Sequence, residues 1–257
     1  MEGGLDGARE PATCYRPTIA LGRHAGPGEG DGLWRDYEQV IALAADLGLD
    51  GVRLGVEWAR VEPHRGVVDE AALERYARAV SFARSRDLHV GVVVVDNVWP
   101  SWLGLEAWLL PWVVPYVLAQ ARRLVERLGD DLGSLVLFAD AAGMVERGFV
   151  HASAPPWRAG ALADARSARD QIDLLYRELA SDHLVGPRLV LASRTVEVGG
   201  DVEDFADALA AGEALEEIHL RSLVRGRGPS AASGALLVRH EGVWQHSPAS
   251  ELLRILR

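Results

Sequence analysis

Short apolar strand patterns alternate with amphipathic helix patterns from about Thr18 to the end of this 257-residue chain. The clearest strand is Val90–Val95, a continuous apolar run typical of strands that are buried on both faces. Strands that alternate with helices form parallel sheets joined by right-handed crossovers. No GxGxxG motif follows the first strand, so a dinucleotide-binding fold has no support. The pattern therefore predicts an α/β fold, a (β/α)8 TIM-type barrel, shortened or irregular because only about seven strands are evident.

The predicted elements divide the chain into a mobile N-terminal arm, residues 1–15, and one barrel domain, residues 16–257. Besides Val90–Val95, strands are expected at Thr18–Leu21, from Gly51, and at Ser134–Phe138, Leu189–Val196, Ile218–Leu223 and Ala235–Val238. Helices are expected at Tyr37–Leu47, after the N-cap Asp69, at Val114–Leu128, at Leu162–Leu179, near Leu209 and at Ala249–Leu256.

The stretch Gly51–Pro63, GVRLGVEWARVEP, predicts a strand that ends in a polar and aromatic mouth. Val52, Leu54 and Val56 alternate with Arg53, Gly55 and Glu57, so the arginine and the glutamate share a strand face. Charged groups are costly to bury without partners, which favours a functional site here. The alternative is a packed Trp58 beside a structural Arg–Glu pair.

Composition excludes several classes of function. The net charge of -10 makes nucleic acid an improbable partner, because a negative field repels phosphates. All 27 basic residues are arginines, so lysine-based Schiff-base chemistry and a P-loop are excluded. Cys14 is the single cysteine, which rules out an internal disulfide. We expect no cofactor, no membrane partner and, since no signal peptide is evident, a cytoplasmic location. The sequence does not predict the oligomeric state.

Carboxylates and tryptophans gather where the predicted strands end. In (β/α) barrels the chemistry lies at the carboxyl ends of the strands. Indole rings stack on sugar rings, and carboxylates bind hydroxyl groups and transfer protons. The alternative is that the tryptophans plug and cap the barrel. The residues at these strand ends are Arg53, Glu57, Trp58, Asp96, Asn97, Trp99, Trp102, Asp140, Thr195, Glu197 and His219.

These segments resemble glycoside hydrolase family 1, the retaining β-glucosidases, over about the first two-thirds of the chain. Gly51–Pro63 is similar to the family's Arg-Phe-Ser strand followed by Trp-Ser-Arg-Ile-x-Pro. Val94–Leu103, VVDNVWPSWL, is similar to Thr-Leu-x-His-x-Asp-Leu-Pro-x-Trp-Leu. Leu128–Asp140 resembles the stretch that ends in Asn-Glu-Pro, and Gly148-Phe149 and Ala154-Pro155 resemble the Gly-Tyr and Ala-Pro that follow it.

The resemblance implies roles for single residues, with departures from the family pattern. Asp140, in Ala139-Asp140-Ala141, stands at the acid/base position, and its carboxyl is one methylene shorter than the family's glutamate. Asp96 stands at the sugar-binding histidine, and Arg53 matches the arginine beside the nucleophile. The nucleophile motif has no clean counterpart; Glu197 is nearest in character, and Glu57 is the other candidate carboxylate. The expected substrate-binding residues are Arg53, Trp58, Asp96, Asn97, Trp99 and Trp102.

Four functional hypotheses remain open from the sequence. The first is a family-1-like barrel that binds a sugar or a glycosylated small molecule, with catalysis weak, altered or lost. The second is an active retaining O-glycosyl hydrolase with Asp140 as acid/base. The third is a non-catalytic structural or regulatory barrel. The fourth is a divalent-metal site of oxygen ligands, formed from Glu57, Asp96, Asp140 and His219, which would favour Mg or Mn.

Overall fold

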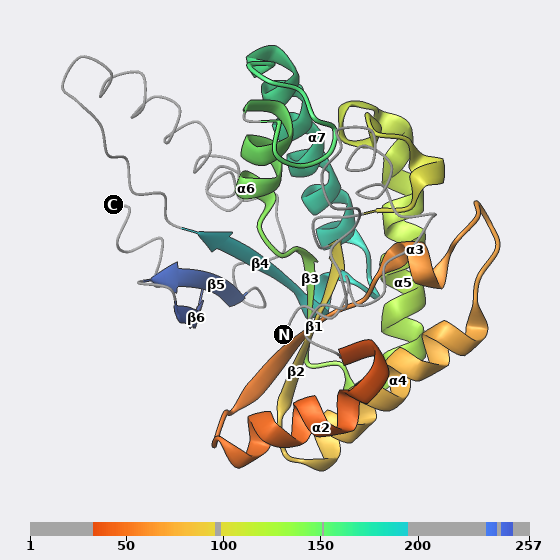
Figure 1. The fold of residues 1–257 in the computed structure, drawn as a ribbon, viewed down its shortest axis with the longest axis vertical. Helices are drawn as coiled ribbons and strands as arrows, with labels where there is room; N and C mark the ends of the chain where they lie inside the picture. Colours follow the sequence, from red (N-terminus) through yellow and green to blue (C-terminus); the bar gives the residue numbers. More distant parts are fainter. Residues whose placement is uncertain (1–32, 96–98, 151, 195–234, 241–242, 249–257) are drawn as a thin grey trace.

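The computed structural model describes residues 33–95, 99–150, 152–194, 235–240 and 243–248 (Figure 1). Its centre is a six-stranded sheet with the strands in the order of the sequence. Neighbouring strands are parallel from β1 to β5, and β6 is antiparallel to β5. The strands are β1 (Gly51–Gly55), β2 (His89–Val95), β3 (Ser134–Phe138), β4 (Leu189–Arg194), β5 (Ala235–His240) and β6 (Val243–Pro248).

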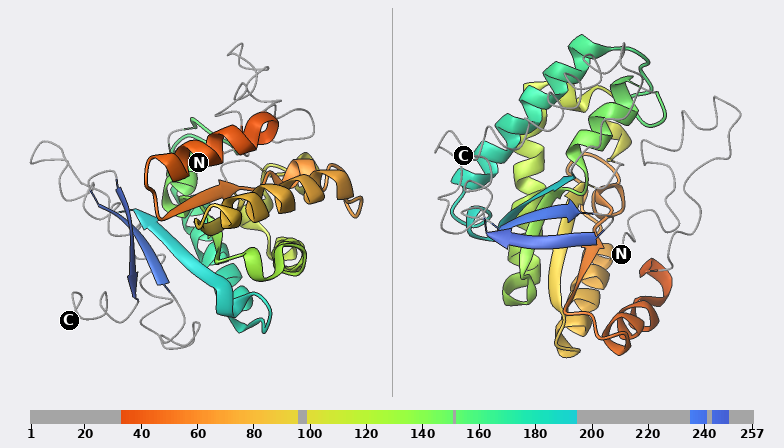
Figure 2. Two further views of the ribbon diagram at one scale, coloured as in Figure 1. Left: turned by 90° about the horizontal axis from the view of Figure 1, so that it is seen from below. Right: turned by 90° about the vertical axis from the view of Figure 1, so that its left-hand side faces the viewer.

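Helices connect the first four strands and pack along one side of the curved sheet (Figures 1 and 2). Consecutive parallel strands joined by right-handed crossovers place every helix on the same face, which is the winding of a barrel. The α-helices are α2 (Leu33–Asp46), α3 (Trp58–Val61), α4 (Glu70–Ser85), α5 (Val114–Leu128), α6 (Ala141–Val145) and α7 (Leu162–Ser181). The shorter turns are η2 (Ser101–Leu103), η3 (Ala107–Leu109), η4 (Pro111–Val113), η5 (Gly129–Asp131), the π-helical turn η6 (Glu146–Val150) and η7 (Gly186–Arg188).

Local sequence signals determine where the helices begin and end. Asp69 is the N-cap of α4, and its carboxylate accepts a hydrogen bond of 2.9 Å from the backbone N–H of Ala72. Gly48 and Gly129 follow the ends of α2 and α5 with φ values of 73° and 56°, a region that only glycine enters without strain. The predicted N-cap at Asp69 is confirmed.

The strands bury both of their faces. Leu54, Val92 and Leu135 belong to the large core between the sheet and the helices. Val93, Val136 and Val190 are paired across three strands and form part of a smaller cluster on the opposite face. Every residue of β2 after His89 is buried, which confirms the strand predicted from the apolar run Val90–Val95.

Arg53 lies on the same face of the sheet as this smaller cluster, because alternate residues of a strand share a face. It is paired in register with Gly91, which is paired in turn with Ser134. A Cβ on Gly91 would lie 3.0 Å from the hydroxyl of Ser134 and 3.8 Å from Cγ of Arg53. Glycine at this position therefore leaves room for the hydroxyl of Ser134, beside the half-buried arginine.

The structure confirms most predicted elements and corrects two. Helix α3 begins at Trp58, two residues after the end of β1, where the sequence suggests a strand that continues into a turn. Strand β6 and its antiparallel pairing were not predicted. The arm 1–15, the strands Thr18–Leu21 and Ile218–Leu223, and the helices near Leu209 and at Ala249–Leu256 lie outside the described residues.

Candidate functional site

The carboxyl ends of β1 to β4 point to the same edge of the sheet, because these strands are parallel. Of the residues predicted to act at this edge, Glu57 follows β1 and Asp140 follows β3. Asp96, Asn97, Thr195, Glu197 and His219 lie outside the described residues. The described part of the candidate site is therefore built around two carboxylates, Glu57 and Asp140.

Asp140 is the N-cap of α6, and both of its carboxylate oxygens accept hydrogen bonds. Oδ1 accepts from the backbone N–H of Gly143 at 2.9 Å, and Oδ2 accepts from Nη1 of Arg147 at 3.3 Å. The side chains of Asp140 and Arg147 are 21% and 35% exposed, so the pair is reached by solvent. Arg147 comes from the π-helical turn η6. Such turns are rare in proteins, and those that occur are often found at functional sites.

Glu57 is held by an arginine in the same way, but it is almost fully buried. Its side chain is 3% exposed, and Oε2 accepts from Nε and Nη2 of Arg60 at 3.0 and 2.9 Å. The guanidinium of Arg60 lies 4.1 Å from the ring centroid of Trp34, a cation–π distance. The backbone N–H of Glu57 donates to the hydroxyl of Tyr76 at 3.2 Å. Burial, followed by the charge of Glu57, raises the pKa of that hydroxyl.

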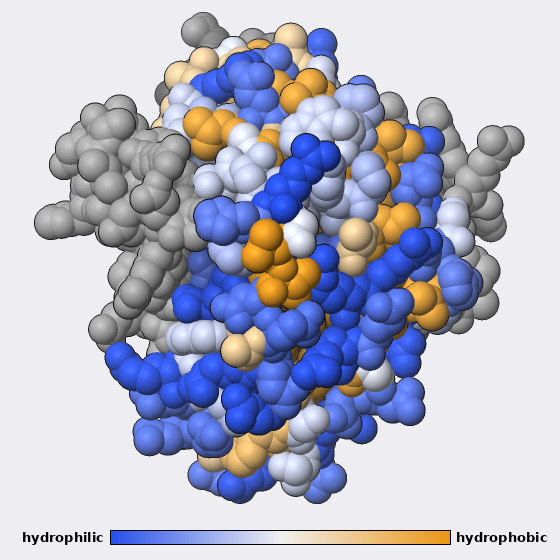
Figure 3. Space-filling view, turned by 90° about the vertical axis from the view of Figure 1, so that its right-hand side faces the viewer, coloured by the Kyte–Doolittle hydropathy of each residue, from blue (hydrophilic) through white to orange (hydrophobic). Residues whose placement is uncertain are grey.

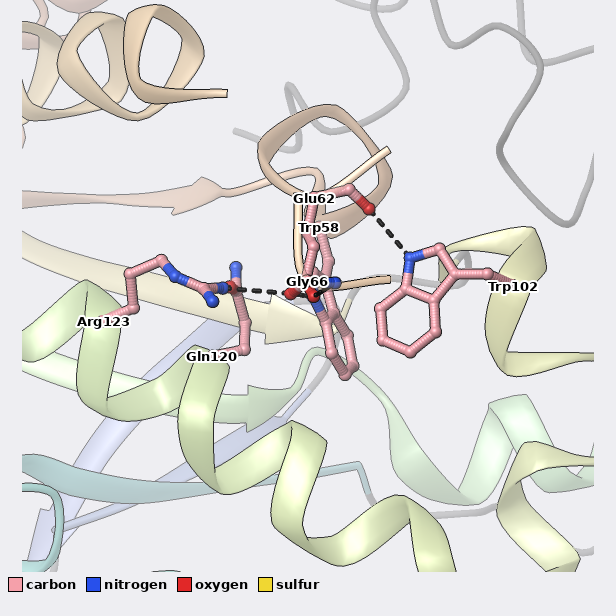
Figure 4. A network of polar contacts seen from close by, with 6 residues as sticks. All are labelled: Trp58, Glu62, Gly66, Trp102, Gln120 and Arg123. Carbon is pink, nitrogen blue, oxygen red and sulfur yellow. Dashed lines mark hydrogen bonds and ion pairs between the residues drawn. The ribbon is translucent and has the colours of Figure 1, made fainter. Parts of the chain in front are cut away.

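A third carboxylate, Glu62, lies at the centre of a polar network behind this edge (Figure 4). Its carboxylate accepts from Nε1 of Trp58 at 3.2 Å, from the backbone N–H of Gly66 at 2.8 Å and from Nη1 of Arg123 at 3.1 Å. Its backbone carbonyl accepts from Nε1 of Trp102 at 2.9 Å. The network ties the β1–α4 connection to the β2–α5 connection and to α5, and so supports the chain around Glu57.

The tryptophans predicted to bind a sugar are mostly packed inside the protein. Trp58 and Trp99 are 1% and 0% exposed, and the indole of Trp99 donates to the carbonyl of Gly104 at 2.8 Å. Trp102 is half-buried and meets Trp58 edge to face, with centroids 5.9 Å apart. In this conformation Trp58 and Trp99 offer no ring surface to a ligand. The structure thus favours the alternative in which they plug and cap the barrel.

Within the described residues, no group of three or more His, Cys, Asp or Glu side chains could hold a metal ion. Two residues of the metal hypothesis, Glu57 and Asp140, are described, and each accepts from an arginine. No described helix is long and apolar enough to cross a membrane. On the face shown in Figure 3, hydrophilic residues surround several separate apolar patches.

Sequence comparison finds relatives but no family model that matches the chain. The chain is 29% identical over 113 residues to the beta-glucosidase-like SFR2, chloroplastic, of Oryza sativa subsp. japonica, covering 41% of this chain and 18% of that protein. It is 30% identical over 124 residues to the galactolipid galactosyltransferase SFR2, chloroplastic, of Arabidopsis thaliana, covering 45% of this chain and 20% of that protein. The matched segments thus span about a fifth of these relatives.

Structure comparison extends over almost the whole chain. A beta-glycosidase from Pyrococcus horikoshii superposes with a TM-score of 0.75 at 16% identity, over 96% of this chain and 57% of that one. The beta-glycosidase BGL167 gives 0.63 at 18% identity, over 95% and 66%. The virulence factor SghA from Agrobacterium tumefaciens gives 0.64 at 16% identity, over 88% and 64%. The chain therefore has a TIM-type barrel fold, the fold of these β-glycosidases. The chain spans about half to two-thirds of the length of these three proteins.

The barrel contains contacts that the sequence did not predict. Arg60 and Arg147 were not assigned as partners of Glu57 and Asp140, and Glu62 was not singled out. One signal was present for the local contact of Asp140, because aspartate is a preferred N-cap residue whose side chain accepts from the helix backbone. The spacing from Asp140 to Arg147 carries no such signal, because a π-helical turn is not evident from residue pattern.

Proposed function

We propose that this barrel binds a sugar or a glycosylated small molecule at the carboxyl ends of its strands, with catalysis weak, altered or lost. The observation that carries the proposal is the position of Asp140. It follows β3 of a β-glycosidase fold, remains 21% exposed, and stands where the sequence resemblance expects the acid/base carboxyl.

Two further observations support a sugar as the ligand class. One relative is named a beta-glucosidase-like protein and the other a galactolipid galactosyltransferase, and both names refer to enzymes that act on sugars. Carboxylate oxygens that accept from arginine still have lone pairs, so the 21% exposed Asp140 can accept from a sugar hydroxyl as well. Because the name of the Arabidopsis protein includes a galactolipid, a glycolipid is one candidate ligand within this class.

Altered catalysis is expected because Glu57 and Asp140, the two carboxylates of the described site, are each paired with an arginine. A retaining glycosidase needs two carboxyls about 5–5.5 Å apart, one of which attacks the anomeric carbon. Glu57 is 3% exposed and held by two guanidinium contacts, which makes it a poor nucleophile for a substrate. An active hydrolase would therefore depend on Glu197, which lies outside the described residues.

Thermal unfolding with a panel of sugars tests the proposal. The panel contains nitrophenyl and methyl β-glucosides and β-galactosides. We expect at least one of these sugars to raise the Tm of the wild-type protein. A ligand at 100 times its Kd stabilises the native state by about 2.7 kcal/mol. Asp140→Ala should reduce the shift, whereas Asp130→Ala should not, because Asp130 precedes β3 at the opposite end of the sheet. No shift with any sugar, or equal shifts in both variants, would refute the proposal.

Three further measurements separate the remaining hypotheses. Stabilisation by Mg²⁺ or Mn²⁺ alone would favour the metal site. Release of nitrophenol that disappears in Asp140→Ala would favour the active hydrolase. Copurification of a partner chain together with no response to any sugar would favour the structural or regulatory barrel.

A further inference from the structure

Three described carboxylates that follow β1 or β3 near the candidate site accept a hydrogen bond from an arginine. The pairs are Glu57 with Arg60, Glu62 with Arg123, and Asp140 with Arg147. Glu57 and Glu62 are buried, whereas Asp140 is 21% exposed. Among these three, Asp140 is the carboxylate that a substrate or a water molecule can reach.

The contacts of Asp140 are those of an ionised carboxylate, the form in which a general base begins its reaction. Its two oxygens face the N–H of Gly143 and the guanidinium of Arg147, and both donors bind the ionised form. A general acid must instead hold its proton and direct it at the leaving oxygen.

The surroundings also leave the carboxylate little freedom to turn. A Cβ on Gly143 would lie 2.6 Å from Cγ of Asp140 and 2.8 Å from Nη1 of Arg147, so the backbone of α6 is in close contact with the pair. The carboxyl is also one methylene shorter than a glutamate at this position. Asp140 is thus held close to its own helix rather than extended from it.

We propose that Asp140 acts as a base, and that the site takes glycosides whose leaving group departs unaided as a stable anion, such as a nitrophenolate, a carboxylate or a phosphate. This inference rests on the proposed function and names its substrate class. In the step, the oxygen of water bonds to the anomeric carbon. The bond from that carbon to the leaving oxygen breaks, and its electron pair leaves with the oxygen. The proton of water passes to Asp140 and then to solvent.

A series of glycosides with one sugar and different leaving groups tests this inference. The sugar is the one that stabilises the protein best, linked to 2,4-dinitrophenol, 4-nitrophenol, phenol or methanol in order of falling acidity. General acid catalysis contributes about 10²–10⁴-fold to a rate. Without it, we expect kcat/KM for the dinitrophenyl glycoside to exceed that for the phenyl glycoside by at least that factor. Asp140→Asn should lower turnover of the dinitrophenyl glycoside, and Asp130→Asn should not.

Azide provides a second readout, because it attacks the anomeric carbon without losing a proton. Azide should restore turnover of the dinitrophenyl glycoside in Asp140→Asn and yield the glycosyl azide. Asp140→Asn that slows only the phenyl and methyl glycosides would show that Asp140 is a general acid and overturn the inference. Sugar-dependent stabilisation without turnover of the dinitrophenyl glycoside would also overturn it, while leaving the proposed function intact. With no stabilisation by any sugar, both would fail.

Discussion

Replacing Glu62 by alanine is expected to destabilise this protein far more than replacing an exposed glutamate that is also paired with an arginine. Glu62 is 5% exposed and accepts from donors in three parts of the chain: Trp58, Gly66 and Arg123. The donor indole of Trp58 is 1% exposed, so water cannot easily replace the lost acceptor. Glu62→Ala therefore leaves a buried N–H and a half-buried guanidinium without this partner.

The magnitude follows from these contacts. A buried donor left without an acceptor costs about 1–3 kcal/mol, and removing one member of a buried ion pair costs about 3–5 kcal/mol. We expect Glu62→Ala to lower the free energy of unfolding by about 3–5 kcal/mol. Glu74→Ala is the matched control, because Glu74 pairs with Arg127 one turn further along α5. That pair is 45% and 41% exposed, so its loss should cost about 0–1 kcal/mol.

Urea unfolding followed by tryptophan fluorescence and circular dichroism measures both variants. A lower midpoint with an unchanged slope reports a loss of stability. A double variant, Glu62→Ala with Arg123→Met, should be less destabilised than the sum of the two single variants, because it removes both charges. A loss below about 1 kcal/mol for Glu62→Ala, or a loss equal to that of Glu74→Ala, would refute the account of Glu62 as the centre of the network.

Three further outcomes are expected. Burial raises the pKa of Asp182, but the hydrogen bonds from Arg122 and from two backbone N–H groups outweigh it, so the pKa lies below the ordinary value. Asp182 therefore stabilises the fold above about pH 4, and this contribution is lost as the pH falls through the lower, folded-state pKa. The difference in unfolding free energy between wild type and Asp182→Asn should shrink below that pH; a constant difference would contradict the reasoning. Trp58→Phe should cost about 1–3 kcal/mol in urea unfolding, and the exposed Trp112→Phe less than about 0.5 kcal/mol. Gly143→Ala should weaken sugar-dependent stabilisation, since its Cβ would overlap the carboxylate of Asp140; an unchanged Tm shift would show that this carboxylate does not contact the sugar.

The sequence predicted the framework of the barrel well because each signal was local. The alternation from Val52 to Gly55 and the apolar run Val90–Val95 each depend only on which faces of their own strand are buried, although β1 ends before Val56 and Glu57. The cap at Asp69 and the glycines after α2 and α5 depend on the backbone of a single turn. The antiparallel β6 was missed because its partner is set by the tertiary pairing with β5 and not by its own residue pattern.

The candidate site was predicted only in part, because its contacts join residues that are distant in sequence or in an irregular turn. Glu57 and Asp140 could be placed at strand ends, but no pattern shows that each accepts from its own arginine. Trp58 and Trp99 stand at the predicted edge, yet their rings turn into the core and are almost fully buried. Whether an indole faces a ligand or the core depends on packing between elements, which residue order alone does not reveal.

The most direct test of the account is a crystal structure of the protein with a bound aryl β-thioglycoside, which resists cleavage. The account predicts that the sugar lies at the carboxyl ends of β1 and β3, with a hydroxyl group or the anomeric centre within hydrogen-bonding distance of Asp140. Arg147 should still contact Asp140 in the complex. A sugar bound at the opposite end of the sheet, or a complex in which Asp140 contacts only Gly143 and Arg147, would contradict the central claim.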